Sequence, residues 1–300
     1  MPVEISDWDD LDDVRLDLDN DYVLINNLDS STDGYEDVGD DWEPIQDFEG
    51  ELDGDGHTIS DLVVDYYYDF AGNEGAGLIG STLQAGGGVV IKNLGLISVD
   101  ITSTVDNGST INGAGTILGI NNGTTSMTNC FVRSGSVGIS GSSDFGGNSA
   151  SGLIGWDRGT LTADKCYSVL DSITASNTGD FGSADTYGLV NDDNNSTVSN
   201  SFWNTTTSGV TTGGGTGKTT AEMKDIDTYT DTATTGLDEA WNFTTLWAID
   251  SGINEGYPYF DISVATGVSV GIKIGGTFEQ KPLMIKKSGT FEPASGLTVM

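Results

Sequence analysis

The sequence contains little of what most catalytic and metal sites are built from. Its 300 residues include 1 histidine, 2 cysteines and 11 lysines and arginines. A catalytic triad or a histidine-bearing metal site would have to rely on His57 alone, and two cysteines form neither a disulfide framework nor a zinc motif. Few basic residues also argue against nucleic-acid binding, because that binding depends on Lys and Arg neutralising phosphates.

Long apolar runs are missing as well, so no segment is expected to insert into a membrane. Residues 1–20 have neither a basic start nor an apolar stretch, and we expect no secretory signal there. The chain is therefore expected to be made and kept in solution, or to leave the cell by a route other than secretion.

Acidic residues dominate the charge. The 46 Asp and Glu residues against 11 Lys and Arg residues give a formal net charge of -35. Like charges at this density repel one another and oppose the compact state unless salt screens them. The Debye length falls to about 3 Å near molar salt. We predict a protein adapted to concentrated brine, with an acidic tail or a calcium-binding surface as the alternative explanation of the charge.

Glycine is abundant, with 43 residues, and threonine, serine and asparagine are frequent. Glycine and β-branched threonine are poor helix formers, and both are common where strands and turns alternate. The composition predicts an all-β fold of many short strands joined by glycine turns.

Two short patterns recur along the chain. Copies of the first pattern are GAGLIGS at 75–81, GAGTILG at 113–119, SGLIGWD at 151–157 and YGLVNDD at 187–193. Copies of the second pattern are VIKNLGLISV at 90–99, SMTNCFVRSG at 126–135, TADKCYSVLD at 162–171 and TVSNSFWNTT at 197–206, with a weaker early copy, TISDLVVD, at 58–65. Equivalent positions of the second pattern recur every 35 or 36 residues.

A fixed period with strand-like content predicts a solenoid, in which each repeat buries its face only by stacking on its neighbours. Two columns of equivalent side chains should form ladders inside a coil of parallel strands. The first column is Ile59, Ile91, Met127, Ala163 and Val198; the second is Leu62, Leu94, Cys130, Cys166 and Ser201. The two cysteines are then stacked, buried small hydrophobes. Whether 36 residues make one coil or two stays open.

Turns of the solenoid should occur at two places in each repeat. Asparagine tolerates left-handed backbone, so the column of Asn93, Asn129 and Asn200 suits a turn. Each glycine-rich GLIG segment is expected to supply a tight corner and a short strand.

The front of the array differs from its middle, as the end of a solenoid should. Trp8, Leu11 and Val14 follow helical spacing, and the following DYVLINNLD has the pattern of a strand. Residues 1–44 are therefore predicted to form a cap on a β-helix that spans residues 45–210.

The segment TTGGGTGKTTAEM, residues 211–223, looks like a nucleotide-binding loop. A threonine stands where the first glycine of a phosphate loop belongs, and the preceding NTTTSGVTT is no buried strand. Thr219 and Glu222 instead have the spacing of a capping box. We predict a glycine-rich lead into a short helix near 220–229, within a closing cap of residues 211–264.

After about residue 265 the chain carries a large share of all its basic residues. Two copies of a small unit, IKIGGTFEQKP at 272–282 and IKKSGTFEP at 285–293, lie side by side in the sequence. Alternation around a glycine turn predicts paired hairpins. Residues 265–300 are predicted to be a separate assembly module. Its candidate contact residues are Phe278, Phe291, Lys273 and Lys286.

The candidate binding surface is the run Tyr66, Tyr67 and Tyr68. Exposed aromatic side chains stack on sugar rings or bury at a protein partner. Alternation along a strand points one face of such a run inward, so packing in the core or at an edge is the alternative.

Two further features are candidate sites. The acidic run DLDND at 17–21 lacks the glycine and glutamate of an EF-hand, so we expect a solvated acidic turn, with an irregular cation site as the alternative. His57 lies between turn residues, and a structural role is expected for it. No catalytic, metal or cofactor-binding residue is assigned, and no cofactor is expected.

These motifs resemble the GLUG-motif β-helix proteins, which occur in microbial surface adhesins and in large secreted proteins. The resemblance covers roughly residues 5–260. Its motifs are DWEPIQDFEGELDGDGHTISDLVV at 41–64, GAGLIG at 75–80, VIKNLGLISV at 90–99 and SASGLIGW at 149–156, with SNSFWNTTTSG, GGTGKTTAEMKD, WNF, LWAID and NEGYPYF as the closing part. It implies a right-handed parallel β-helix and surface recognition, with no catalytic residues to transfer. The copies at 113–119 and 187–193 depart from GLIG, so distorted corners are expected there.

The tail at 272–293 looks like the paired lysine–glycine–aromatic hairpins at the ends of structural proteins of tailed viruses. Together with the acidic composition and the missing secretory signal, this resemblance implies a virion surface protein of a haloarchaeal tailed virus. A tail fibre or receptor-binding protein is expected first, then a capsid turret or decoration protein. The third candidate is a haloarchaeal cell-surface adhesin, and the fourth is a polysaccharide-degrading β-helix enzyme.

The expected role is structural and not enzymatic. Expected partners are other virion proteins, further copies of the chain in a homo-oligomer, and a host surface glycoprotein or glycan. Nucleic acid and membrane insertion are not expected.

Overall fold

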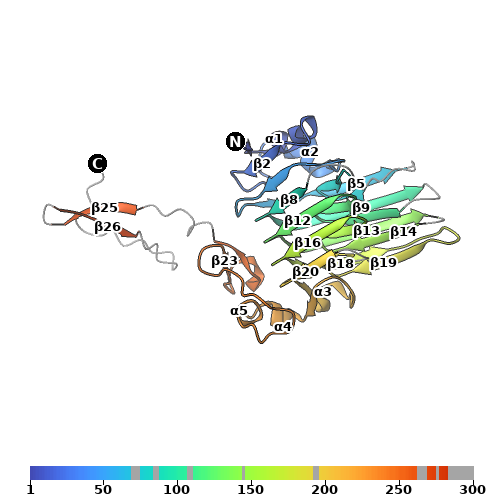
Figure 1. Ribbon diagram of the computed structural model, residues 1–300. Helices are drawn as coiled ribbons and strands as arrows, with labels where there is room; N and C mark the ends of the chain where they lie inside the picture. Colours follow the sequence, from blue (N-terminus) through green and yellow to red (C-terminus); the bar gives the residue numbers. More distant parts are fainter. Residues whose placement is uncertain are drawn as a thin grey trace.

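A computed structural model describes residues 1–68, 75–83, 88–106, 111–143, 146–191 and 196–261, and the backbone of a hairpin at 269–274 and 277–282. The body is a solenoid of parallel strands that climbs from the N-terminus to a closing segment (Figure 1). The expected all-β class and parallel β-solenoid are confirmed.

The first long sheet is entirely parallel, with the order β1-β2-β3-β8-β12-β16-β20. Its strands are β1 (Val3–Ile5), β2 (Asp21–Leu24), β3 (Glu51–Asp53), β8 (Val89–Lys92), β12 (Thr124–Thr128), β16 (Thr160–Asp164) and β20 (Ser196–Ser199). Since β1 and β2 join this ladder, parallel rungs begin within the segment 1–44 that the sequence assigns to the cap.

The second long sheet has the order β4-β9-β13-β17-β21-β22, with β5 beside β9 and β18 beside β13. Its strands are β4 (Thr58–Ser60), β5 (Val63–Tyr68), β9 (Gly95–Asp106), β13 (Phe131–Ser142), β17 (Tyr167–Val169), β18 (Ser172–Ala175), β21 (Phe202–Asn204) and β22 (Thr216–Lys218). Two shorter parallel sheets close the coil. They are β6 (Gly75–Ala76), β10 (Ile111–Gly115), β14 (Gly147–Ser151) and β19 (Ser183–Tyr187), and β7 (Ile79–Ser81), β11 (Leu118–Asn121) and β15 (Ile154–Asp157).

The strand register answers the question of one coil or two. Met127 pairs with Ile91 on one side and with Ala163 on the other, each 36 residues away, so one repeat is one coil. Ala163 pairs in turn with Val198, which confirms these four members of the first predicted column.

The placement of Ile59 and Leu62 in the two columns is wrong. Ile59 pairs with Leu96 on the second sheet, and Leu52 takes the position beside Ile91. Four residues, 54–57, form the turn between β3 and β4, where the next repeat uses only two residues between β8 and β9. An ungapped comparison of the repeats therefore shifts the early copy out of register.

The predicted turn column is confirmed. Asn93, Asn129 and Asn200 have φ values of 51°, 52° and 48°, and Lys165 has 55°. The residue after each, including Cys130 and Cys166, lies in the interior, and both cysteines are fully buried. The backbone N–H of Tyr167 donates to the carbonyl of Cys130 at 3.0 Å, so the two cysteine turns lie on adjacent coils as predicted.

The GLIG segments form the expected corners between a sheet of the β6 type and one of the β7 type. The expectation of a distorted corner at 113–119 is wrong, because Gly113 pairs with Gly75 and Leu118 with Ile79. In the last copy Val190 still pairs with Ile154, and residues 192–193 lie outside the described part of the chain.

Short helices cover the first end of the coil (Figure 1). They are α1 (Trp8–Asp12), η1 (Asp13–Leu16), α2 (Tyr35–Val38) and η2 (Gly39–Asp41). Trp8, Leu11 and Val14 are buried, as their helical spacing predicts.

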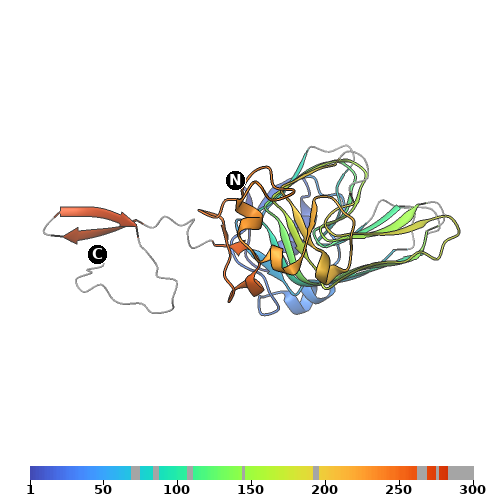
Figure 2. The same cartoon turned by 90° about the horizontal axis from the view of Figure 1, so that it is seen from below.

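The closing segment covers the other end, and Figure 2, seen from below, shows its helices in front of part of the coil. It contains α3 (Thr205–Ser208), α4 (Thr220–Met223), α5 (Asp227–Thr230), β23 (Trp247–Ala248), η3 (Asn254–Gly256) and β24 (Tyr259–Phe260). The capping box of Thr219 and Glu222 is confirmed at the start of α4.

Beyond the closing segment, β25 (Ser269–Ile274) and β26 (Thr277–Pro282) form an antiparallel hairpin, as predicted for the first of the two tail units. Lys273 pairs with Phe278 across it. Phe291, Lys286 and the second unit lie outside the described residues. Among the helices that the structure describes, none is long and apolar enough to cross a membrane.

Candidate functional site

The tyrosine run lies on β5, which pairs with the long strand β9. Tyr66 is half-buried and packs against the hydrophobic core, whereas Tyr67 is 56% exposed. This alternation follows from the two-residue period of a strand. Only Tyr67 of the predicted cluster is shown facing outward; the side chain of Tyr68 lies outside the described residues.

Tyr67 stands at the edge of a flat surface made by β5, β9, β13 and β18, which we call the hydroxyl face. Its outward side chains are Asp65, Tyr67, Asp100, Thr102, Thr104, Ser136, Ser140, Ser172 and Thr174. Neighbouring strands lie about 4.8 Å apart, so these side chains form regular rows. Hydroxyls both donate and accept hydrogen bonds, which suits a ligand rich in hydroxyl groups.

A shallow hollow of about 430 Å³ lies beside the hydroxyl face, where the strands bend. Ser98 and Ser134 have left-handed backbone there, with φ values of 56° and 59°. Ser136 donates to Asp100 at 2.8 Å, and Asp171 accepts from the backbone N–H of Gly135 at 3.0 Å. The hollow therefore presents carboxylate and hydroxyl groups that are already oriented by hydrogen bonds.

The outer face of the second long sheet carries an aromatic cluster that the sequence analysis missed. Phe131, Tyr167 and Phe202 pair in register on β13, β17 and β21. The rings of Phe131 and Tyr167 stack with centroids 5.0 Å apart and planes 5° apart. Trp241 and Trp247 of the closing segment pack on them, with centroids 4.7 Å from each other. The closing segment thus covers a side of the coil as well as its end.

Two ion pairs hold the closing segment on the coil. Nη1 of Arg133 lies 2.7 Å from Oε1 of Glu255, and Nζ of Lys165 lies 2.8 Å from Oε1 of Glu239. The glutamates are largely exposed, so each pair adds little stability alone. They fix where the segment lies, while the aromatic cluster supplies most of the burial.

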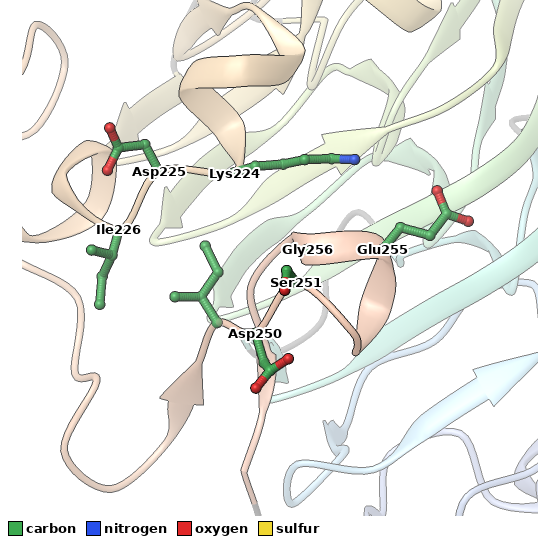
Figure 3. Close-up of a pocket in the computed structure, with 8 residues that line it drawn as sticks. Lys224, Asp225, Ile226, Asp250, Ser251, Glu255 and Gly256 are labelled. Atoms are coloured by element: carbon green, nitrogen blue, oxygen red, sulfur yellow. The ribbon is translucent and has the colours of Figure 1, made fainter.

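Two adjoining hollows of about 650 and 300 Å³ open on the closing segment, and they share Ile226 and Ile249. We call their combined lining the trough, which consists of residues 224–226, 243–251, 255–256 and 261. Figure 3 shows the larger hollow, with Asp225, Asp250 and Glu255 around it. The trough was not predicted from the sequence, because its residues come from four separate stretches of the chain.

Lys218, the lysine of the supposed phosphate loop, lies on β22 and is 7% exposed. Its Nζ sits 5.5 Å from the centroid of the Phe202 ring, and β22 pairs in parallel with β21. The lysine is thus turned to the closing segment's core, away from the position that a bound phosphate would need.

ATP and GTP with Mg²⁺ are expected to leave the melting temperature unchanged. A ligand that binds only the folded state stabilises it by about 2.7 kcal/mol at a hundredfold excess over Kd. Thermal unfolding of the whole protein across a nucleotide titration measures this. A rise in melting temperature that grows with nucleotide concentration would restore the phosphate-loop interpretation.

The remaining candidate residues, His57 and the acidic run 17–21, have partners within the protein. Nδ1 of His57 lies 3.1 Å from Oδ1 of Asn27, and burial lowers the pKa of His57. At the acidic run, a hydrogen bond that the protonated Asp17 carboxyl donates to the carboxylate of Asp19 raises the pKa of Asp17. Within the described ranges no three His, Cys, Asp or Glu side chains are grouped to hold a metal ion.

Comparison with known proteins identifies no family for the chain. No protein-family model and no curated protein matches the chain. A solved structure described as a "putative immunoglobulin A1 protease from Bacteroides ovatus" aligns with a TM-score of 0.40 and 14% identity, over 87% of this chain and 92% of that one. A similarity at this level carries no argument about activity.

Proposed function

We propose that the protein is a non-enzymatic surface protein of a haloarchaeal tailed virus, and that it acts as a tail fibre or receptor-binding protein. The observation that carries the recognition role is the hydroxyl face with Tyr67 at its edge. Regular hydroxyl rows beside an exposed aromatic ring fit a surface glycan of the host, because sugars offer hydroxyls for hydrogen bonding and an apolar ring face for stacking.

The virion assignment rests on the sequence. The GLUG resemblance supports a surface role, the basic tail resembles the hairpins of tailed-virus structural proteins, and the net charge of -35 fits a brine environment. A capsid turret or decoration protein is the second proposal, supported by the same tail. Under either proposal the partners are other virion proteins and further copies of this chain.

Antibody labelling of purified particles tests the assignment. Gold label at the tail tip is the expected result, and label over the capsid would favour the decoration protein. Label on the host cell envelope, with none on particles, would overturn the virion proposal in favour of an adhesin.

Replacing Tyr67 by Ala is expected to slow adsorption of particles to host cells by about 30-fold, the effect of losing an aromatic hot spot of about 2 kcal/mol. Tyr67→Phe keeps the stacking surface and should adsorb nearly as the parent does. The residue is exposed, so neither change should alter folding. Equal adsorption by the parent and the Ala variant would exclude Tyr67 from the recognition surface.

A further inference from the structure

The trough combines an apolar floor with an acidic rim. Ile226 is 42% exposed, and Phe243, Leu246 and Ile249 are half-buried beside it. Asp225 and Asp250 are exposed, and no ion pair to either occurs among the described residues. A grouped apolar patch on so acidic a surface marks a contact site.

The chemistry of the trough selects a basic, apolar segment as its occupant. Its rim carries four acids, and its one cation, Lys224, has its Nζ 4.6 Å from the ring of Tyr257. The chain itself contains a matching segment at 283–293, LMIKKSGTFEP, in which two lysines stand between apolar residues. Four lysines and two glutamates give residues 262–300 a net charge of +2, which leaves -37 on residues 1–261.

The geometry places this segment within reach of the trough. Asp261 lines the trough and is the last described residue before the hairpin. The hairpin pairs Ser269 with Pro282, so residue 283 leaves it beside the point where the chain entered. The connection 262–268 spans at most about 24 Å when extended. A short tether of this kind gives a millimolar effective concentration, which favours the chain's own segment over another molecule.

We propose that the trough is the docking site of this chain's own segment 283–293. Its apolar residues cover Ile226 and Ile249, and Lys286 and Lys287 meet Asp225 and Asp250. Contact ion pairs of this kind persist in brine, where only charges farther apart than a few ångströms are screened. Docking fixes the hairpin β25–β26 beside the closing segment. The docking of segment 283–293 does not depend on the proposed function of the protein.

Zero-length carbodiimide coupling of the full-length protein in high salt tests the docking, with equal parts of ordinary and ¹⁵N-labelled chains. Mass spectrometry should find Lys286 or Lys287 joined to Asp225 or Asp250 within single chains. Links that join an ordinary chain to a labelled one would mean that a second copy occupies the trough, which overturns docking within the chain. The absence of links to the trough would overturn the docking site itself.

A matched pair of variants separates docking from general charge attraction. Ile226→Ser removes the apolar floor and should lower the yield of these links about tenfold, as expected for the lost burial of one isoleucine. Ile253→Ser changes an isoleucine of similar exposure, 47%, outside the trough and should leave the yield unchanged. Equal yields for the two variants would also overturn the proposal. Far-UV circular dichroism confirms that both are folded.

Discussion

In dilute buffer the protein is expected to lose its compact fold and to regain it near molar salt. Residues 1–261 carry a net charge of -37, with seven basic residues among them. At about 0.1 M salt the Debye length is about 10 Å, longer than the spacing between neighbouring coils, so acids on successive coils repel one another. Near 1 M it falls to about 3 Å, and only charges in contact still interact.

The structure shows where this repulsion concentrates. Burial, together with the nearby carboxylates of Asp7, Asp37, Asp13 and Asp10, raises the pKa of Asp9 in the first cap. A raised pKa means that the folded state disfavours the ionised form of this side chain. Six of the seven basic residues of the body form ion pairs or ring contacts, and they offset few of the remaining acids: Arg15, Lys92, Arg133, Lys165, Lys218 and Lys224.

Circular dichroism against sodium chloride concentration measures the effect. Sucrose is the control, because it favours compact states by exclusion from the surface but screens no charge. Screening predicts recovery of structure in salt and none in sucrose at equal osmolality. A flat curve from low to molar salt, or equal recovery in sucrose, would remove the electrostatic explanation.

The coil could be predicted from the sequence because individual equivalent residues recur at a fixed period of 35 or 36 positions. The register at Met127 and the left-handed turns at Asn93 and Asn129 follow from one rule, that equivalent residues stack at equal spacing. The rule failed at Ile59, where a turn of different length breaks the spacing. Insertions in turns carry no periodic signal, so only the strand pairing reveals them.

The closing segment shows a different limit. Its helix cap at Thr219 depends on residues three apart and was predictable. Its packing on the side of the coil depends on contacts such as Tyr167 with Pro258, 91 residues apart, where the tyrosine hydroxyl donates at 2.6 Å. The sequence does contain a signal for the aromatic cluster, because an aromatic residue ends each of the segments NCF, KCY and NSF at the turns: Phe131, Tyr167 and Phe202. A single sequence does not show which other segment covers this column of aromatic residues. The trough was missed for the same reason.

The candidate recognition surface was half predictable. Alternation predicts that one face of the tyrosine run points inward, and Tyr66 and Tyr67 divide in that way. The hydroxyl face was not predicted, because it joins β5 and β18 through the two strands between them. Such a surface appears only when the coils are stacked.

Gly155, the last glycine of the GLIG corner at 152–155, is expected to be important for stability. A Cβ built on Gly155 would lie 2.4, 2.6 and 2.7 Å from the backbone N, C and O of Ala114. These are main-chain atoms of β10, held by pairing with β6 and β14, so they cannot move aside without breaking two ladders. Gly155→Ala is therefore expected to cost about 3 kcal/mol or more, at the upper end of what overpacking costs.

Gly138→Ala is the matched control. Its Cβ would lie 2.9 Å from the Thr174 hydroxyl, which can rotate away on the open hydroxyl face, and at an ordinary contact distance of 3.9 Å from the Thr174 carbonyl oxygen. Replacing glycine at such a site should be neutral or stabilise by up to about 1 kcal/mol, because the unfolded chain loses freedom. At the last corner Asn191 occupies the position equivalent to Gly155 and is buried, and its Nδ2 donates a hydrogen bond to Oγ of Ser149 at 3.1 Å. Denaturant unfolding in molar salt compares the two variants; equal stability would mean that the corner is not closely packed.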